Sequence, residues 1–264
     1  MDNIEYLENE FIKDITETGR FILSIGIKGG GKTYKMLQFV KYALYNNIYE
    51  RYHLILPMYE AEQNDSYGFL RNQQHCYIYN GYSEKVSKLV EKDRLKYKTL
   101  FIIDDASAEL VKNMDNTFMK IITTTRHGQG CTLWACVHSA KRILAPVVRQ
   151  NIDWLFVYKI ANRKLLIDIY EEYASMTFDT LNEFMQLYKS AMDEKYNAVL
   201  FTIQSSNIDP MTNEWETLKS YQDITLKPHA PIKKPVEKKE PNDKKLKINN
   251  LNTMLSHMFK KKRF

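Results

Sequence analysis

Glycine and cysteine are scarce in this chain, which has nine glycines and three cysteines among its 264 residues. Three cysteines cannot form a disulfide framework, and Cys76, Cys131 and Cys136 lack the paired spacing of a metal site. Cys131 and Cys136 fall in one strand-like run, so we expect them to be core residues. Together with the short apolar runs and the acidic N-terminus of the chain, the cysteine content predicts a soluble protein of a reducing compartment.

Long hydrophobic runs are missing as well. The most apolar stretches, FILSIGI and TLFII, have the length of strands and are far shorter than a membrane span. The opening MDNIEYLENE is acidic, which does not fit a secretory signal peptide. With 44% apolar residues, the chain is expected to fold as one medium-sized domain with additional segments.

Acidic residues are rare at the C-terminal end. Residues 227–264 hold 12 Lys/Arg, 3 Asp/Glu and four of the seven prolines, a net charge of +9 against −3 for residues 1–226. Such a composition cannot build a core, so we predict a disordered basic tail that ends in a short amphipathic segment. The predicted organisation is a helical extension over residues 1–19, a globular domain over 20–226 and the tail over 227–264.

Strand-like and helical segments alternate between these limits. Short apolar runs predict strands, and apolar residues at a period near 3.6 predict helices. The predicted strands are residues 20–27, 51–57, 76–82, 98–107, 131–139, 153–160 and 196–203. The predicted helical segments are residues 32–47, 83–96 with Ser83 as N-cap, 113–126, 142–151 (a short helix or turn) and 166–192. This order predicts an α/β fold with a mostly parallel sheet between two helical layers.

Three of the nine glycines are consecutive, in the stretch GIKGGGKT. Gly26, Gly31, Lys32 and Thr33 fit the phosphate-binding loop G-x-x-x-x-G-K-[ST], and the match lies between a predicted strand and a predicted helix. Backbone N–H groups of such a loop wrap the phosphates, the lysine reaches the β and γ phosphates, and the hydroxyl binds Mg²⁺. We predict that ATP is held by Gly26, Ile27, Lys28, Gly29, Gly30, Gly31, Lys32, Thr33 and Tyr34.

The stretch LFIIDD ends a predicted buried strand with two carboxylates. The carboxyl ends of strands are the ligand-binding edge of open α/β sheets. We therefore expect Asp104 to hold Mg²⁺ together with Thr33, and Asp105 to orient or deprotonate the attacking water. The simpler alternative is that both aspartates cap the next turn, but their combination with the phosphate loop favours the catalytic interpretation.

A third group of polar residues surrounds the next two strands. Arg126 precedes a glycine loop, His138 and Ser139 end a strand, and Arg149 precedes another. Singly, Arg126 could compensate a helix terminus, His138 could be a core histidine and Arg149 a solvated charge. Together they suggest a γ-phosphate sensor at His138 and Ser139 and an arginine finger at Arg126 or Arg149.

The motifs together resemble the FtsK–HerA superfamily, in particular the small DNA-packaging ATPases of poxvirus and virophage type. The resemblance covers residues 20–205 and rests on the phosphate loop, IIDD, the pair Arg126–His127, the polar strand end and P-x-x-R-x-N at residues 146–151. Family members commonly carry glutamine where this chain has His138.

The resemblance implies a P-loop NTPase domain of RecA/ASCE type that hydrolyses ATP with Mg²⁺. It implies a homo-oligomeric ring, pentamer or hexamer, that drives double-stranded DNA of any sequence into a preformed capsid. An arginine of one subunit, Arg126 before Arg149, would complete the site of its neighbour. The implied location is the host-cell cytoplasm or the viral assembly site, with association with the virion as an alternative.

Other functions stay open at this point. A nucleotide-dependent switch or assembly protein at a membrane, or a nucleotide kinase, could carry the same loop. DNA contacts are expected after Asp105 or around residues 126–130, and the tail could dock on a capsid or portal protein, an anionic membrane or DNA. A solubilising tail with no partner is the remaining alternative.

Overall fold

The computed structural model describes residues 3–56, 65–71, 73–105, 115–139, 144–205, 207–211 and 215–221. All of them lie in the first of two compact units of the chain, which spans Met1–His229. The predicted tail lies outside the described residues, as does the segment directly after Asp105. None of the described helices is long and apolar enough to cross a membrane.

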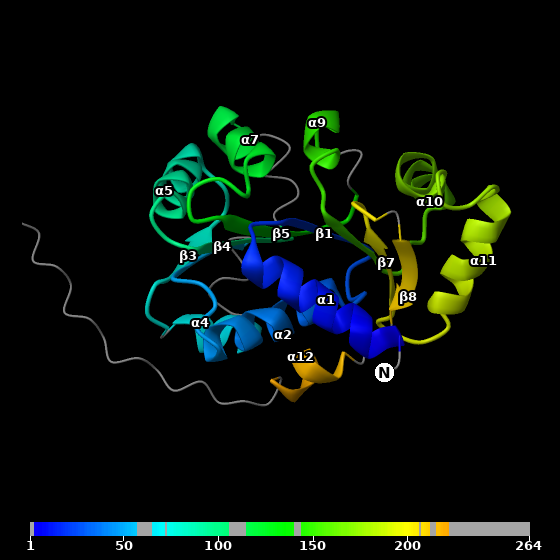
Figure 1. The fold of residues 1–264 in the computed structure, drawn as a ribbon, viewed down its shortest axis with the longest axis horizontal. Coiled ribbons are helices and arrows are strands. Elements are labelled where there is room, and N and C mark those ends of the chain that lie inside the picture. The colour runs from blue at the N-terminus through cyan, green and yellow to red at the C-terminus, as the bar shows by residue number, and fades with distance from the viewer. Residues whose placement is uncertain are drawn as a thin grey trace, which may run out of the picture. The chain divides into compact units, whose positions relative to one another are not determined.

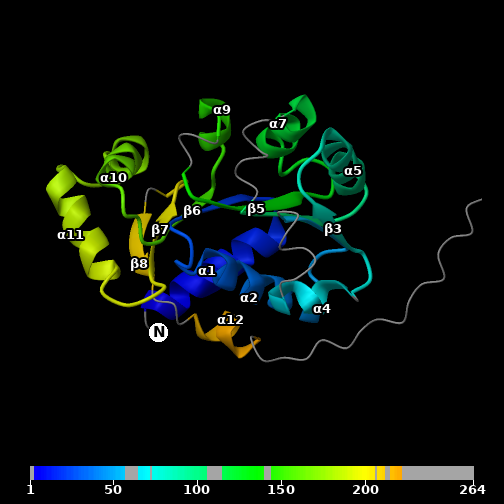
Figure 2. The same cartoon turned by 180° about the vertical axis from the view of Figure 1, so that it is seen from behind.

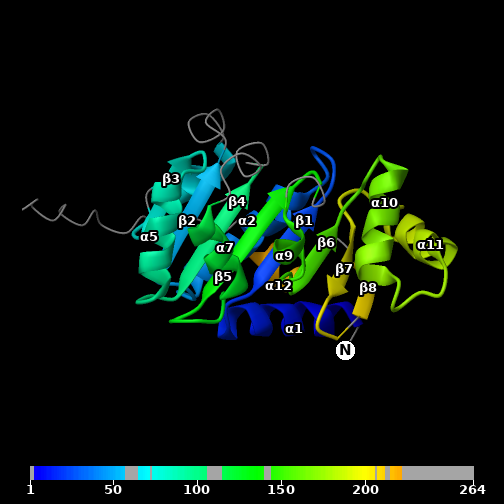
Figure 3. The same cartoon turned by 90° about the horizontal axis from the view of Figure 1, so that it is seen from above.

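The centre of the fold is a mixed sheet in the order β3-β2-β4-β5-β1-β6-β7-β8 (Figure 3). Adjacent strands from β3 through β6 are parallel, whereas β7 and β8 are antiparallel to their neighbours. The strands are β1 (Phe21–Ile25), β2 (Arg51–Leu56), β3 (Cys76–Asn80), β4 (Thr99–Asp104), β5 (Cys131–Val137), β6 (Trp154–Val157), β7 (Ala198–Thr202) and β8 (Asn207–Met211).

Helices cover both faces of the sheet, which gives three layers (Figures 1 and 2). One face carries α5 (Glu84–Arg94), α7 (Asn116–Thr123), α9 (Pro146–Arg149), α10 (Arg163–Ile169), the π-helix η2 (Tyr170–Ala174) and α11 (Leu181–Ala191). The other carries α1 (Asn3–Glu17), α2 (Lys32–Tyr45), the 3₁₀ turn η1 (Asp65–Tyr67), α4 (Gly68–Arg71) and α12 (Glu216–Ser220). The predicted α/β class and three-layer arrangement are confirmed.

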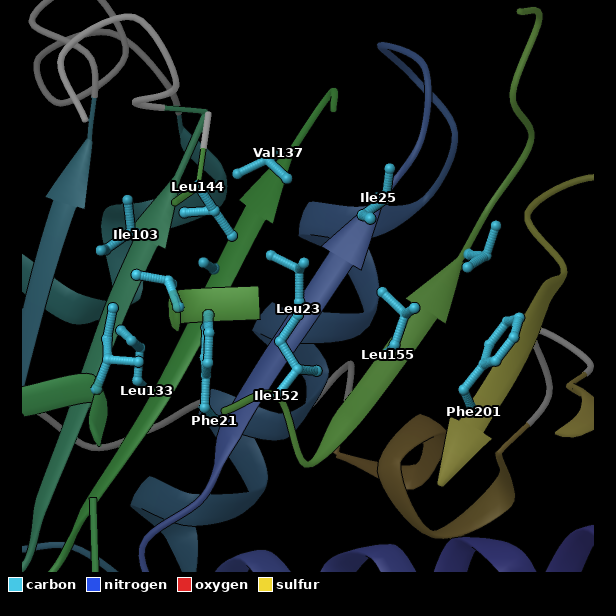
Figure 4. Close-up of a cluster of buried hydrophobic side chains, with 14 of the residues drawn as sticks. Phe21, Leu23, Ile25, Ile103, Leu133, Val137, Leu144, Ile152, Leu155 and Phe201 are labelled. Atoms are coloured by element: carbon cyan, nitrogen blue, oxygen red, sulfur yellow. The ribbon is translucent and has the colours of Figure 1, made fainter. Parts of the chain in front are cut away.

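Strand periodicity divides the core into two clusters. Phe21, Leu23 and Ile25 of β1 join the cluster under α5, α7 and α9, shown in Figure 4, while Ile22 joins the cluster under α1 and α2. Successive side chains of a strand point to opposite faces, so a central strand covered on both sides is mostly apolar, and a polar side chain in it needs a hydrogen-bond partner. All five residues of β1 are buried, and the polar one, Ser24, accepts a hydrogen bond of 3.0 Å from Trp134 Nε1.

Helix α1 runs along the amino ends of the central strands (Figure 3). Phe11 is fully buried, and its ring packs against Trp134, Trp154 and Trp215 among others. Asp14 accepts hydrogen bonds from the Arg20 guanidinium, one of them Nε–Oδ2 at 2.7 Å, and from Trp154 Nε1 at 2.7 Å. Helix α1 is therefore part of the domain core.

The segments that the sequence marked as helical are shorter in the structure than predicted. The region 166–192 holds most of α10, all of η2 and all of α11, and Thr180 is the N-cap of α11, where it forms a capping box with Glu183. Ser83 occupies the N-cap position of α5, although its side chain makes no capping hydrogen bond. Cys131 and Cys136 are buried and free, as predicted.

Candidate active site

The loop between β1 and α2 has the backbone geometry of a phosphate-binding loop. Gly29 and Gly31 have φ angles of 71° and 104°, values that favour glycine. Gly26 leaves no room for a side chain, since an added Cβ would lie 2.7 Å from Tyr158 Cβ. Helix α2 starts at Lys32, so its first N–H groups face the loop. These N–H groups suit a bound anion.

Lys32 lies inside this loop with 6% of its surface exposed. Its Nζ donates hydrogen bonds of 2.9 Å to the carbonyl oxygens of Gly26 and Ile27. Burial lowers the pKa of Lys32, and the nearby Asp105 and Asp104 carboxylates partly oppose that shift. The ammonium is thus held by two neutral acceptors, which a phosphate can replace with a stronger, charged partner.

Asp104 ends β4 directly beside the loop and is 1% exposed. Its Oδ1 accepts a hydrogen bond of 3.0 Å from the Thr33 hydroxyl, and its Oδ2 accepts one from the buried Tyr67 hydroxyl of η1. A carboxylate and a hydroxyl at this separation offer the oxygen ligands that Mg²⁺ prefers. The donor set therefore fits the predicted metal-binding role of Thr33 and Asp104.

The order of the strands brings Asp105 and His138 close together. Strand β5 pairs with both β4 and β1, so the residue after β5 lies between the residues that follow the other two. His138 Nε2 is 2.7 Å from Asp105 Oδ1, and its Nδ1 is 3.0 Å from the carbonyl oxygen of Gly26. Both partners are acceptors, and a neutral imidazole has a single N–H, so it donates to one of them in either tautomer. Ser139 follows and is partly exposed.

Asp105 has a φ angle of 50°, which is uncommon outside glycine. Its backbone N–H donates to the Cys136 carbonyl at 3.2 Å, which holds the turn against β5. The strained turn aims the carboxylate at His138, with 31% of the side chain exposed. Such outliers cluster at functional sites, where a fixed geometry is needed.

The two predicted finger arginines are not brought to the loop of their own chain. Arg126 lies before β5 and pairs with Asp153, which precedes β6, at 2.8 Å. Strands β5 and β6 are both parallel to β1. The pair therefore lies at the amino ends of these strands, whereas the phosphate loop follows the carboxyl end of β1. Arg149 binds Glu172 at 2.7 Å and the Leu144 carbonyl at 2.8 Å. Its side chain is 12% exposed against 51% for Arg126.

The turn that carries Arg126 is anchored on α5. The buried Arg94 donates to the Thr124 carbonyl at 2.6 Å and to the Thr124 hydroxyl at 2.8 Å. Gln129 N–H donates back to the Arg94 carbonyl at 3.0 Å, and Gly128 packs so closely that a Cβ there would lie 2.8 Å from that oxygen. The glycine loop is therefore a fixed turn, and Arg126 projects from it.

The remaining loop residues line a cavity of about 550 Å³. Its lining includes Gly29 to Thr33, Tyr34 and Tyr196. Lys28 is exposed on the loop.

Two residues beside the loop, Tyr67 and Tyr196, escaped the sequence analysis. Neither belongs to a motif, and both reach the site from segments distant in sequence. Long-range packing provides no local signal that could have revealed them.

No protein-family model matches the chain, and no curated protein matches its sequence significantly. Solved structures do match. The genome packaging NTPase B204 from Sulfolobus turreted icosahedral virus 2, in complex with AMPPCP, aligns with a TM-score of 0.57 at 15% identity, over 74% of this chain and 97% of that chain. The chain has the fold of this viral packaging NTPase.

Two further structures of packaging NTPases also align with this chain. The B204 complex with ATP-gammaS aligns with a TM-score of 0.55 at 15% identity, over 74% of this chain and 97% of that chain. The third structure is B204, the DNA-packaging ATPase from Sulfolobus turreted icosahedral virus. It aligns with a TM-score of 0.54 at 15% identity, over 73% of this chain and 97% of that chain. The resemblance predicted from the motifs is confirmed for the fold.

Proposed function

We propose that this chain is a Mg²⁺-dependent ATPase that moves double-stranded DNA into a viral capsid. The observation that carries the proposal is the convergence of Lys32, Thr33, Asp104, Asp105 and His138 on one phosphate loop. This convergence occurs within a fold shared with B204, whose structures include complexes with AMPPCP and ATP-gammaS.

Each residue has a distinct task in the proposed reaction. Backbone N–H groups of Gly29 to Thr33 bind the phosphates, and Lys32 exchanges its two carbonyl partners for phosphate oxygens. The Thr33 hydroxyl and Asp104 would hold Mg²⁺, which supplies neutralisation of the charge that develops on the phosphates. Tyr67 keeps the Asp104 carboxylate in place.

Asp105 orients the attacking water and accepts its proton, and His138 controls this carboxylate. His138 contacts both Asp105 and Gly26, so binding of the γ-phosphate next to Gly26 changes the surroundings of the ring. A sensor at this position reports phosphate occupancy to the carboxylate that acts on water. Ser139 contributes a hydroxyl group next to His138.

Arg126 acts on the site of the neighbouring subunit in a ring. Its position at the opposite sheet edge excludes a role on its own phosphate loop, and its exposure supports a role in trans. A finger arginine stabilises the charge on the transferring phosphoryl group. Arg149 is the second candidate, but its contacts with Glu172 and Leu144 favour a structural role.

DNA is the proposed polymer substrate because B204 is a DNA-packaging ATPase and shares this fold. Contacts with phosphates suit a motor that must pass every sequence, since base readout would impede it. The proposed location is the viral assembly site. The tail, which lies outside the described residues, is proposed to tether the motor to its capsid or portal partner.

Hydrolysis with and without DNA tests the proposal. Phosphate release from Mg²⁺–ATP should rise when linear duplex DNA of unrelated sequences is added, and Lys32→Ala should abolish both rates. DNA affinity should fall steeply with salt, since phosphate contacts release counterions. Hydrolysis that does not respond to DNA would favour a switch protein, and transfer of phosphate to a nucleotide would show a kinase.

A further inference from the structure

The cavity beside the phosphate loop is larger than the phosphates alone require. It measures about 550 Å³, which is in the range of small-molecule sites. Its lining combines the loop from Gly29 to Thr33 with Tyr34, Leu37, Ser66 and Tyr196. Two of the four residues beyond the loop carry aromatic rings and one is aliphatic, which suits a flat heterocycle.

Tyr196 is held at this cavity in an unusual backbone conformation. Its φ angle is 71°, a value that costs free energy in a bulky residue. Tyr196 is 39% exposed, and the Lys195 ammonium lies 5.0 Å from the centroid of its ring. Tyr196 also packs on the loop, since a Cβ added to Gly31 would lie 3.1 Å from Tyr196 Cβ. A strained, half-exposed aromatic beside the last loop glycine indicates a ligand contact.

We propose that Tyr34 and Tyr196 bind the nucleobase by stacking, and that the site accepts purine triphosphates without separating adenine from guanine. The proposal rests on the proposed function, because the loop must hold the triphosphate. Both residues line the cavity with the loop, and each has more than a third of its surface exposed. Stacking tolerates any base, and the larger purine ring gains more from it.

The polar group assigned to the base edge accounts for the proposed acceptance of both adenine and guanine. A stacked tyrosine holds its hydroxyl in a plane parallel to the base, so the hydroxyl assigned to the base edge is that of Ser66, which both donates and accepts. It can therefore face the amino group of adenine or the carbonyl of guanine equally well. Strong discrimination needs a buried group that is left unpaired by the wrong base, and a hydroxyl that can rotate avoids that penalty.

Two substitutions distinguish the contribution of the Tyr196 ring from that of its strained backbone. Tyr196→Asn removes the ring but keeps a residue that tolerates positive φ, whereas Tyr196→Phe keeps the ring and removes the hydroxyl. The matched control is Tyr6→Asn on α1, where Tyr6 is 59% exposed. Affinities for Mg²⁺ complexes of ATP, GTP, CTP and inorganic tripolyphosphate would be measured by calorimetry, with thermal melting of each variant.

We expect the parent to bind ATP and GTP within about fivefold of each other and CTP more weakly. Tyr196→Asn should weaken ATP and GTP about tenfold and leave tripolyphosphate within about twofold, as expected for a lost stacking contact. Tyr196→Phe and Tyr6→Asn should match the parent. Tyr34→Ala should show the same selective loss as Tyr196→Asn.

Equal losses for ATP and tripolyphosphate in Tyr196→Asn would overturn the proposal, because Tyr196 would then only support the loop. Unchanged ATP affinity, or GTP binding more than about tenfold weaker than ATP binding in the parent, would overturn it as well. A parent that binds neither ATP nor tripolyphosphate would refute the proposed function and the base site together. The tripolyphosphate measurement thus distinguishes the two failures.

Discussion

Replacing His138 with alanine should slow ATP hydrolysis without preventing ATP binding. The ring makes two contacts, 2.7 Å to Asp105 and 3.0 Å to the Gly26 carbonyl. The contact with the carboxylate is a hydrogen bond to a charged group, and such a bond contributes about 1.5–3 kcal/mol. If this free energy is expressed in the transition state, the loss corresponds to about a 10- to 150-fold decrease in kcat.

The value of KM should stay within about threefold, because Lys32 and the loop N–H groups are untouched. The assay is steady-state phosphate release at varied Mg²⁺–ATP. His138→Gln retains an N–H donor, so it should recover much of the lost rate. Lys88→Ala, at an exposed ion pair on α5, is the surface control and should match the parent.

A kcat within about twofold of the parent in folded His138→Ala would refute the sensor role. The Asp105–His138 contact would then be a surface hydrogen bond without a catalytic consequence. A higher KM at unchanged kcat would also contradict the reasoning, since it would place His138 among the groups that bind ground-state ATP.

Three further predictions concern Lys32, Arg126 and the buried Lys35. Lys32→Ala should abolish Mg²⁺-dependent hydrolysis, and a parent-like rate would show that the loop assignment is wrong. Mixing inactive Arg126→Ala subunits with inactive Lys32→Ala subunits should restore ATP hydrolysis, because some interfaces then combine an intact Lys32 with an intact Arg126 of the neighbour. Rings that assemble but recover no activity would exclude a role of Arg126 in trans. Burial lowers the pKa of Lys35 to about 8, against an unfolded value near 10.5. The unfolded state therefore binds more protons between these pH values, and the free energy of unfolding rises with pH there. Lys35→Met should remove that rise and stabilise the protein at pH 7 by up to about 3 kcal/mol. The measurement is urea unfolding of parent and variant at pH 7 and pH 10. The same difference in free energy of unfolding at both pH values would contradict the expected titration of Lys35.

The sequence predicts the fold well wherever a short-range pattern determines the structure. Strands such as β1 and β4 are buried on both faces, so their apolar runs are unmistakable. The glycines of the loop are needed for local reasons, positive φ and close packing, that a motif can encode. Strand β8 was not predicted, because Asn207–Met211 contains proline and aspartate, which are rare in strands, and its pairing with β7 stabilises it.

Long-range features of the site could not be predicted in the same way. The sequence shows that His138 follows a strand, but the order β4-β5-β1 decides that it lies between Asp105 and Gly26. Tyr67 and Tyr196 reach the site through packing between separate segments. The position of Arg126 opposite the phosphate loop likewise follows from strand direction rather than from its neighbours in sequence.

Strand β5 gives the proposed ring a direct physical link between successive sites. It runs from the turn that carries Arg126 to His138, and all seven of its residues are buried. At about 3.3 Å per residue it spans roughly 23 Å as one hydrogen-bonded element between β1 and β4. In the proposed mechanism, His138 senses the phosphate of its own subunit while Arg126 completes the next site. The same rigid strand therefore holds both groups, so a shift at one end in response to hydrolysis would be carried to the other.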